Sequence, residues 1–151
     1  MRLEEHVFKC IVANTPLISI DLIIRNTEGK VLLGQRQNRP AKDFWFVPGG
    51  RIFKDESFEI AFQRITKEEL GLKLNLTYTT FLGIYEHFYD DNFSEANFST
   101  HYVVLGYELF VDDLRAELPH TQHSSYKWFD EDTISDDPTV HQYTKNYFLS
   151  R

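Results

Sequence analysis

The stretch VPGGRIFKDESFEIAFQRITKEELGL, residues 47–72, joins a loop with two glycines to an acidic helix. Gly49 and Gly50 allow backbone turns and a close approach by a ligand that other residues resist. From Phe58 onward apolar residues recur at steps of three and four, which predicts a helix with one apolar face. Gly71 is a suitable residue to end that helix. The stretch therefore predicts a ligand-approachable loop followed by an amphipathic helix.

Two carboxylates, Glu68 and Glu69, lie near the C-terminal end of this helix, where the helix dipole disfavours negative charge. A role as oxygen ligands of a divalent cation would explain their position. A solvated acidic face paired with Lys67 and Arg64 would explain it equally well. The helix by itself leaves both interpretations open.

The residues around this stretch predict strands before, between and after helices. Residues 17–25, LISIDLIIR, are β-branched and apolar and predict a central strand, with residues 31–36 as its hairpin partner. The polar segment 89–100 is long for a hairpin and predicts a lid or a binding loop. This order indicates an α/β protein with a mixed sheet and helices on its faces. Further elements are expected as a helix around residues 7–11, strands at 78–88, 101–111 and 126–130, and a helix at 139–149.

Composition narrows the class of protein. A chain of 151 residues is expected to form one domain, residues 1–151. The net charge of −7 and the lack of a Lys/Arg run argue against a nucleic-acid surface, but leave open an arginine cluster for a small phosphate compound. Cys10 is the single cysteine, so no intramolecular disulfide is expected. Residues 1–8 lack an apolar signal region and no stretch approaches membrane-spanning length, so we expect a cytoplasmic protein without membrane partners.

The opening stretch resembles the Nudix box, in which G-x5-E-x7 precedes R-E-U-x-E-E-x-G-U and U is bulky and apolar. The resemblance implies a loop–helix–loop that binds a divalent metal holding a diphosphate, within an α/β/α sandwich around a mixed sheet. Two positions depart from the box, because Ile65 replaces a glutamate and Thr66 replaces a bulky apolar residue. Losing one carboxylate should reduce the number of metals or move a ligand elsewhere. The matching positions are Gly50, Glu56, Arg64, Glu68, Glu69 and Gly71.

Segments outside the box resemble the GDP-mannose mannosyl hydrolase branch of this family, which shares the departure. That branch implies hydrolysis of GDP-mannose, or a related GDP-hexose, to GDP and sugar, with water attacking the anomeric carbon and inverting its configuration. It also implies one Mg²⁺, for which Mn²⁺ can substitute, and a homodimer. One metal suffices because the diphosphate needs neutralising while the water does not. The segments are TPLISIDLIIRN, LLGQRQNRPAKDFWFVPGGR, EHFYDDNFS, THYVVLGYEL and QHSSYKW, within residues 15–130.

The resemblance assigns the metal to the backbone carbonyl of Gly49 and to the side chains of Glu69 and Gln122. It assigns the general base to His123, whose unperturbed pKa of about 6.5 suits proton transfer near neutrality. His120 is a nearby competitor that the resemblance does not favour. Glu68 remains open as a helper, a bystander or a ligand of a second metal.

The remaining predicted roles concern the substrate. Asp21 would be an expensive inward charge in an apolar strand without a function, and the family places a carboxylate there near the sugar. Arg64 either contacts phosphate or braces the loop through Glu56, and His87 is expected to support the lid. The catalytic set is thus His123, Arg36, Asp21 and Tyr102, and the substrate-binding set is Asp21, Arg36, Arg51, Arg64, His87 and Tyr102.

Two other functions remain possible from the sequence. A Nudix pyrophosphatase would cut the same substrate at phosphorus and release GMP and mannose 1-phosphate. A non-catalytic nucleotide-sugar sensor would keep the arginines and Glu69 but gain nothing from His123. The residues do not select among mannose, glucose and fucose as the sugar.

Overall fold

The computed structural model of the protein describes residues 2–111 and 123–149, and for His123 and Ser124 the backbone alone. No helix in this part of the chain is long and apolar enough to cross a membrane. The elements in chain order are α1 (Glu5–Asn14), β1 (Leu17–Arg25), β2 (Val31–Arg36), β3 (Trp45–Phe46), β4 (Gly49–Arg51), α2 (Phe58–Leu70), η1 (Leu76–Tyr78), β5 (Thr80–Tyr89), β6 (Thr100–Phe110), β7 (His123–Phe129), α3 (Glu131–Ile134), α4 (Gln142–Lys145) and η2 (Asn146–Phe148).

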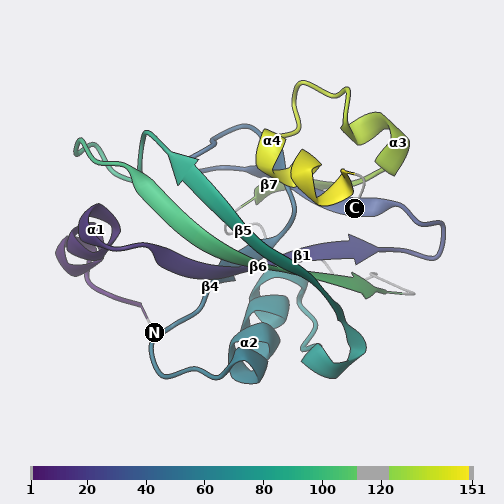
Figure 1. Ribbon diagram of the computed structural model, residues 1–151, viewed down its shortest axis with the longest axis horizontal. Helices are drawn as coiled ribbons and strands as arrows, with labels where there is room; N and C mark the ends of the chain where they lie inside the picture. Colours follow the sequence, from purple (N-terminus) through teal and green to yellow (C-terminus); the bar gives the residue numbers. More distant parts are fainter. Residues whose placement is uncertain (1, 112–122, 150–151) are drawn as a thin grey trace.

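The strands form a mixed sheet in the order β3-β2-β1-β6-β5, with β4 also paired to β1 and β7 to β2. The β1–β6 pair is parallel, and Asp21 lies opposite Gly106 in its register. The other strand pairs are antiparallel. Figure 1 shows α2 on one face of the sheet and α3 and α4 on the other. This arrangement confirms the predicted α/β/α sandwich around a mixed sheet.

Strand β1 is buried on both faces, which explains its nearly continuous apolar sequence. Side chains alternate between the faces of a strand. Ile20, Leu22 and Ile24 therefore enter a core cluster with α2. Ile23 enters a second cluster, on the side of the C-terminal elements. Asp21 is the one ionisable side chain within the strand before its final residue Arg25, and it is buried.

Helix α2 has the predicted bounds for local reasons. The hydroxyl of Ser57 caps its first turn by accepting from the backbone N–H of Ile60 at 3.2 Å. Gly71 ends the helix in the left-handed conformation, with φ 74°, which a residue with a side chain rarely adopts. The apolar face then packs on the sheet and points the end of the helix toward β4.

The helix predicted at residues 139–149 is shorter than expected. Trp45 donates its backbone N–H to the carbonyl of Thr139 and accepts from the N–H of His141. Because the backbone of this segment bridges to β3, helical structure begins only at Gln142 and continues as the short 3-10 turn η2. Periodicity alone did not reveal this competing pairing.

Candidate functional site

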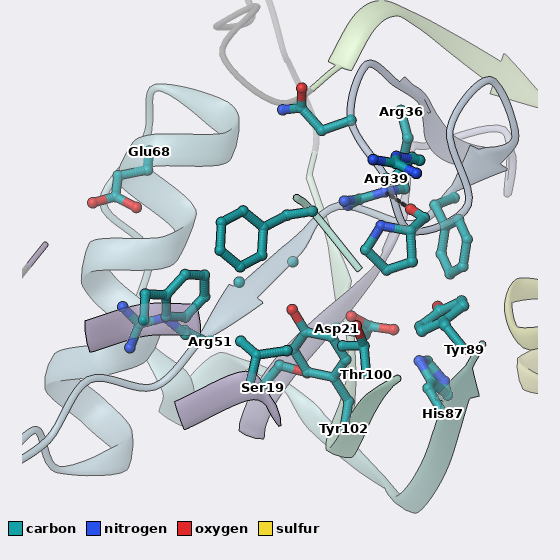
Figure 2. Close-up of a pocket in the computed structure, with 18 of the residues that line it drawn as sticks. Ser19, Asp21, Arg36, Arg39, Arg51, Glu68, His87, Tyr89, Thr100 and Tyr102 are labelled. Atoms are coloured by element: carbon teal, nitrogen blue, oxygen red, sulfur yellow. Dashed lines mark hydrogen bonds between the residues drawn. The ribbon is translucent and has the colours of Figure 1, made fainter. Parts of the chain in front are cut away.

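A cavity of about 860 Å³ opens where β1, β4, β5 and β6 meet the loop after β2. Figure 2 shows Asp21, Thr100 and Tyr102 on its floor, with Arg36 and Arg39 together on one side and Arg51 on another. The structure thus brings the predicted substrate-binding residues around one cavity. These are Asp21, Arg36, Arg51, Arg64, His87 and Tyr102, and Gly49 lines the cavity with them.

The two helix carboxylates have different surroundings. Glu69 is 1% exposed, and its Oε1 accepts the backbone N–H of Gly49 at 3.1 Å. The side chain of Glu68 is 54% exposed and pairs with Arg64 at 3.1 Å. Glu68 is therefore partly solvated and also lines the cavity, whereas Glu69 lies inward against the glycine loop. Its place four residues after Ile65, on the same helical face, is a signal that the sequence already contained.

The glycine at position 49 is required by its surroundings. A Cβ there would lie 2.4 Å from the carbonyl oxygen of Ile20 and 2.5 Å from Oδ1 of Asp21. The loop can consequently run directly between β1 and Glu69. Carboxylate and main-chain oxygens are the hard ligands that Mg²⁺ prefers, so Gly49 and Glu69 fit a divalent cation. The predicted third ligand, Gln122, lies outside the described residues.

The two departures from the family box both serve packing. Ile65 is 1% exposed in the core cluster beneath the sheet, and a Cβ on Gly50 would lie 3.3 Å from its Cγ1. Thr66 is fully buried, donates its hydroxyl to the carbonyl of Gln63, and accepts the backbone N–H of Leu74 at 3.0 Å. Position 65 therefore contributes to the core and supplies no oxygen to the cavity.

Arg64 has the bracing geometry that was one of its two predicted roles. Its guanidinium donates to both carboxylate oxygens of Glu56, at 2.7 and 2.9 Å, and to the carbonyl of Arg51 at 2.8 Å. These hydrogen bonds lower the pKa of Glu56. Arg64 also lines the cavity, so bracing the loop and facing the substrate are compatible.

The other arginines are held by different means. Nε of Arg36 donates to the carbonyl of Pro40 at 2.9 Å. The guanidinium of Arg51 lies over the rings of Phe8 and Phe53, at 4.8 and 4.6 Å from their centroids, and burial lowers its pKa. Such stacking leaves the N–H groups of an arginine free to bind an anion in the plane of the guanidinium.

Asp21 is a buried carboxylate whose pKa is raised from 3.8 to about 7, mainly by burial. A hydrogen bond from the hydroxyl of Tyr147, 2.5 Å from Oδ2, and the nearby charge of Arg36 act in the opposite direction. Tyr102 lies beside it, and burial raises the pKa of its phenol. Asp21 can therefore change charge near neutral pH while both phenols stay protonated.

His87 lies in an aromatic cluster at one end of the cavity. Its ring stacks on Tyr143 with centroids 4.3 Å apart and an interplanar angle of 4°. Burial, helped by His141, lowers its pKa to about 4, so it is neutral at physiological pH. A neutral, stacked imidazole supplies shape and hydrogen bonding to the cavity wall but no positive charge.

Arg39 and Tyr147, which are both outside the predicted set, also contribute to the site. Arg39 lines the cavity and donates to the carbonyl of Ser94 at 2.6 Å, which ties the loop after β2 to the segment predicted as a lid. Tyr147 reaches Asp21 from a position 126 residues away in the chain. A lone arginine in a loop and a tyrosine in a segment of mixed polar and apolar residues carry no local signal for these contacts.

Two predicted catalytic residues have their backbones opposite one another. His123 opens β7 and is the register partner of Arg36 on β2, next to an irregularity in the ladder. The side chain of His123, and the whole of His120 and Gln122, lie outside the described residues.

Comparison with known proteins agrees with this arrangement. The family model for the NUDIX domain matches residues 15–149. The chain belongs to the Nudix family. A curated relative of this Nudix protein, the low-salt glycan biosynthesis protein Agl8 of Haloferax volcanii, is 44% identical over 142 residues, which cover 94% of this chain and 88% of that protein.

Solved Nudix structures share the fold. The MutT protein of Methanosarcina mazei superposes with a TM-score of 0.71 at 22% identity, over 89% of this chain and 92% of that one. The MutT NUDIX hydrolase of Burkholderia pseudomallei gives 0.70 at 23% identity, over 89% and 97%. The protein is an enzyme of the Nudix hydrolase class, whose members generally use divalent metals such as Mg²⁺.

Proposed function

We propose that the protein hydrolyses GDP-mannose, or a related GDP-hexose, to GDP and free sugar in the presence of Mg²⁺. The oxygen of water bonds to the anomeric carbon as the bond from that carbon to the β-phosphate oxygen breaks. The bonding electrons leave with GDP, one water proton passes to a base, and the configuration at carbon inverts. Sugar C–O bonds break through a state with positive charge on the ring, so the site must stabilise the departing anion and the ring together.

The observation that carries this proposal is the burial of Ile65. A reaction at phosphorus in this family often uses several carboxylates on the box helix to hold more than one metal. Here position 65 belongs to the core, Glu68 lines the cavity but pairs with Arg64, and Glu69 alone of the three contacts Gly49. This arrangement supports a single cation on the diphosphate and an attack away from phosphorus.

The residues of the cavity suit the two ends of such a substrate. When bound at Gly49 and Glu69, Mg²⁺ would act as a Lewis acid that neutralises charge on the diphosphate. Arg36 and Arg51 supply positive charge to the same group, and Tyr102 is a protonated phenol that can donate to the departing oxygen. Asp21, buried beside Tyr102, is the acceptor that can bind a sugar hydroxyl and face the developing ring charge.

The activation of water is assigned to His123, and the third metal ligand to Gln122, from the family resemblance. The register pairing of His123 with Arg36 supports a base beside the phosphate-binding arginine. The name of the Haloferax relative refers to glycan biosynthesis, which is compatible with a nucleotide sugar as substrate. We extend the proposal to a homodimer that works in the cytoplasm.

Product analysis in ¹⁸O-water tests the proposal. The protein is incubated with GDP-mannose and Mg²⁺, and the products are identified by mass spectrometry. Labelled mannose with unlabelled GDP is the expected result. GMP with mannose 1-phosphate, labelled on either phosphate, would show attack at phosphorus, and tight binding without turnover would indicate a sensor. His123→Ala should bind GDP-mannose but lose turnover, and full activity in that variant would exclude His123 as the base.

A further inference from the structure

We infer that Tyr147, from the C-terminal turn η2, is a positioning residue that orients the Asp21 carboxylate toward the bound sugar. The inference rests on the proposed function for what Asp21 does, and on the observed contacts for how Asp21 is held. Tyr147 donates its hydroxyl to Oδ2 of Asp21 at 2.5 Å, and a bond from a phenol to a carboxylate is among the stronger hydrogen bonds in proteins.

The contact engages one carboxylate oxygen and leaves the other toward the site. The other oxygen, Oδ1, faces Gly49: a Cβ added to Gly49 would lie 2.5 Å from it. Asp21 lines the cavity, whereas Tyr147 is 2% exposed and belongs to the apolar cluster that contains Ile23, on the same face of the sheet as Asp21. The hydroxyl therefore approaches the carboxylate from the buried cluster and fixes its rotation, without itself lining the cavity.

The fold makes space for this approach. Gly106 lies directly opposite Asp21 in the β1–β6 register. A Cβ on Gly106 would lie 3.1 Å from Cε1 of Tyr147 and 3.2 Å from Cε1 of Tyr85. The rings of Tyr147 and Tyr85 pack edge to face over the glycine, with centroids 4.6 Å apart. Gly106 is thus the position that lets the phenol lie flat enough on the sheet to reach β1.

The C-terminal segment is also tied to other site strands, which holds Tyr147 in place. The hydroxyl of Thr144 accepts the backbone N–H of Val47, just before the glycine loop, at 3.2 Å. Tyr143 bonds through its hydroxyl to both the N–H and the carbonyl of Phe88 on β5. The segment is therefore anchored on both sides of Asp21.

A double-mutant cycle tests the inference with Tyr147→Phe, Asp21→Ala and the double variant. Misplacing a reacting group by about 1 Å can cost on the order of a hundredfold in rate, so Tyr147→Phe should lower kcat for GDP-mannose by roughly ten- to a hundredfold. In the Asp21→Ala background the same change should have no further effect, because its target is gone. Tyr107→Phe, on β6 away from the cavity, is the matched control.

Two readouts separate positioning from a general structural role. Binding of GDP, which lacks the sugar, should be unchanged in Tyr147→Phe by calorimetry. The second readout is the NMR spectrum of metal-free protein with ¹³Cζ-labelled tyrosine, in which the resonance of Tyr147 is identified as the one missing in Tyr147→Phe. This resonance should shift in Asp21→Ala but not in the control Asp90→Asn. Gly106→Ala, which displaces the ring while keeping the hydroxyl, should lower kcat in the same direction as Tyr147→Phe.

The inference is overturned if Tyr147→Phe has the same kcat as the unmodified protein, or if the effects of Tyr147→Phe and Asp21→Ala on kcat multiply in the double variant. It is also overturned if the Tyr147 resonance does not shift in Asp21→Ala. A protein that does not hydrolyse GDP-mannose, but whose Tyr147 resonance shifts in Asp21→Ala, would refute the proposed function while supporting the contact. The two failures are therefore distinguishable.

Discussion

Asp21→Asn is expected to change how stability depends on pH in the metal-free protein. The pKa of Asp21 rises from its ordinary value of 3.8 to about 7 in the folded chain, chiefly through burial. The unfolded chain therefore ionises at lower pH than the folded one. Below about pH 4 the stabilising contribution of the neutral carboxyl is complete, and it is lost as the pH rises through about 7.

The size of the effect follows from the shift. A difference of about 3 pKa units corresponds to about 4 kcal/mol across the whole titration. Of this total, about 2.5 kcal/mol of unfolding free energy is lost between pH 5 and pH 8, because the folded and unfolded chains bind different numbers of protons over most of that interval. Asparagine does not titrate, so the variant should gain about that much stability relative to the unmodified protein over this interval.

The measurement is urea unfolding of both proteins at pH 5 and pH 8 with EDTA present. Other titrating groups are shared, so the difference between the proteins isolates Asp21. Asp90→Asn, at an exposed position, is the control for the change of residue type. Parallel pH dependence of Asp21→Asn and the unmodified protein would refute the account of Asp21 as a carboxyl group whose pKa is raised to about 7 by burial.

Three further substitutions test the placement of the box residues. Ile65→Glu, which restores the family carboxylate, should cost at least about 3 kcal/mol because it buries an unpaired charge; unchanged stability with a second Mn²⁺ in a binding titration would show that position 65 faces the metal. Gly49→Ala should lower the melting temperature and abolish turnover, since its Cβ would lie 2.5 Å from Oδ1 of Asp21, and normal turnover would contradict the geometry. Arg64→Lys should lose about 1–2 kcal/mol in urea unfolding because a lysine cannot make the bidentate bond to Glu56, and an equal loss in Glu56→Gln is expected from the shared contact.

Much of the candidate site was predictable because its parts are encoded locally or by the family pattern. The box spacing identified the loop and helix, and a carboxylate in the middle of the apolar strand 17–25 singled out Asp21. The role of Glu69 was assigned by the family resemblance, because the helix alone left its direction open. The predicted roles of Gln122 and His123 remain predictions, since Gln122 and the side chain of His123 lie outside the described residues.

By itself, the sequence determined the elements whose signals lie within a few residues of each other. Strand β1 has the predicted bounds because its β-branched residues favour extended backbone. Helix α2 has them because Ser57 caps its first turn and Gly71 ends it. Only the tertiary structure decided the shortened C-terminal helix and the bond from Tyr147 to Asp21. Both depend on which distant backbone or hydroxyl lies alongside once the two cores are packed, and hydrophobic periodicity contains no information about that choice.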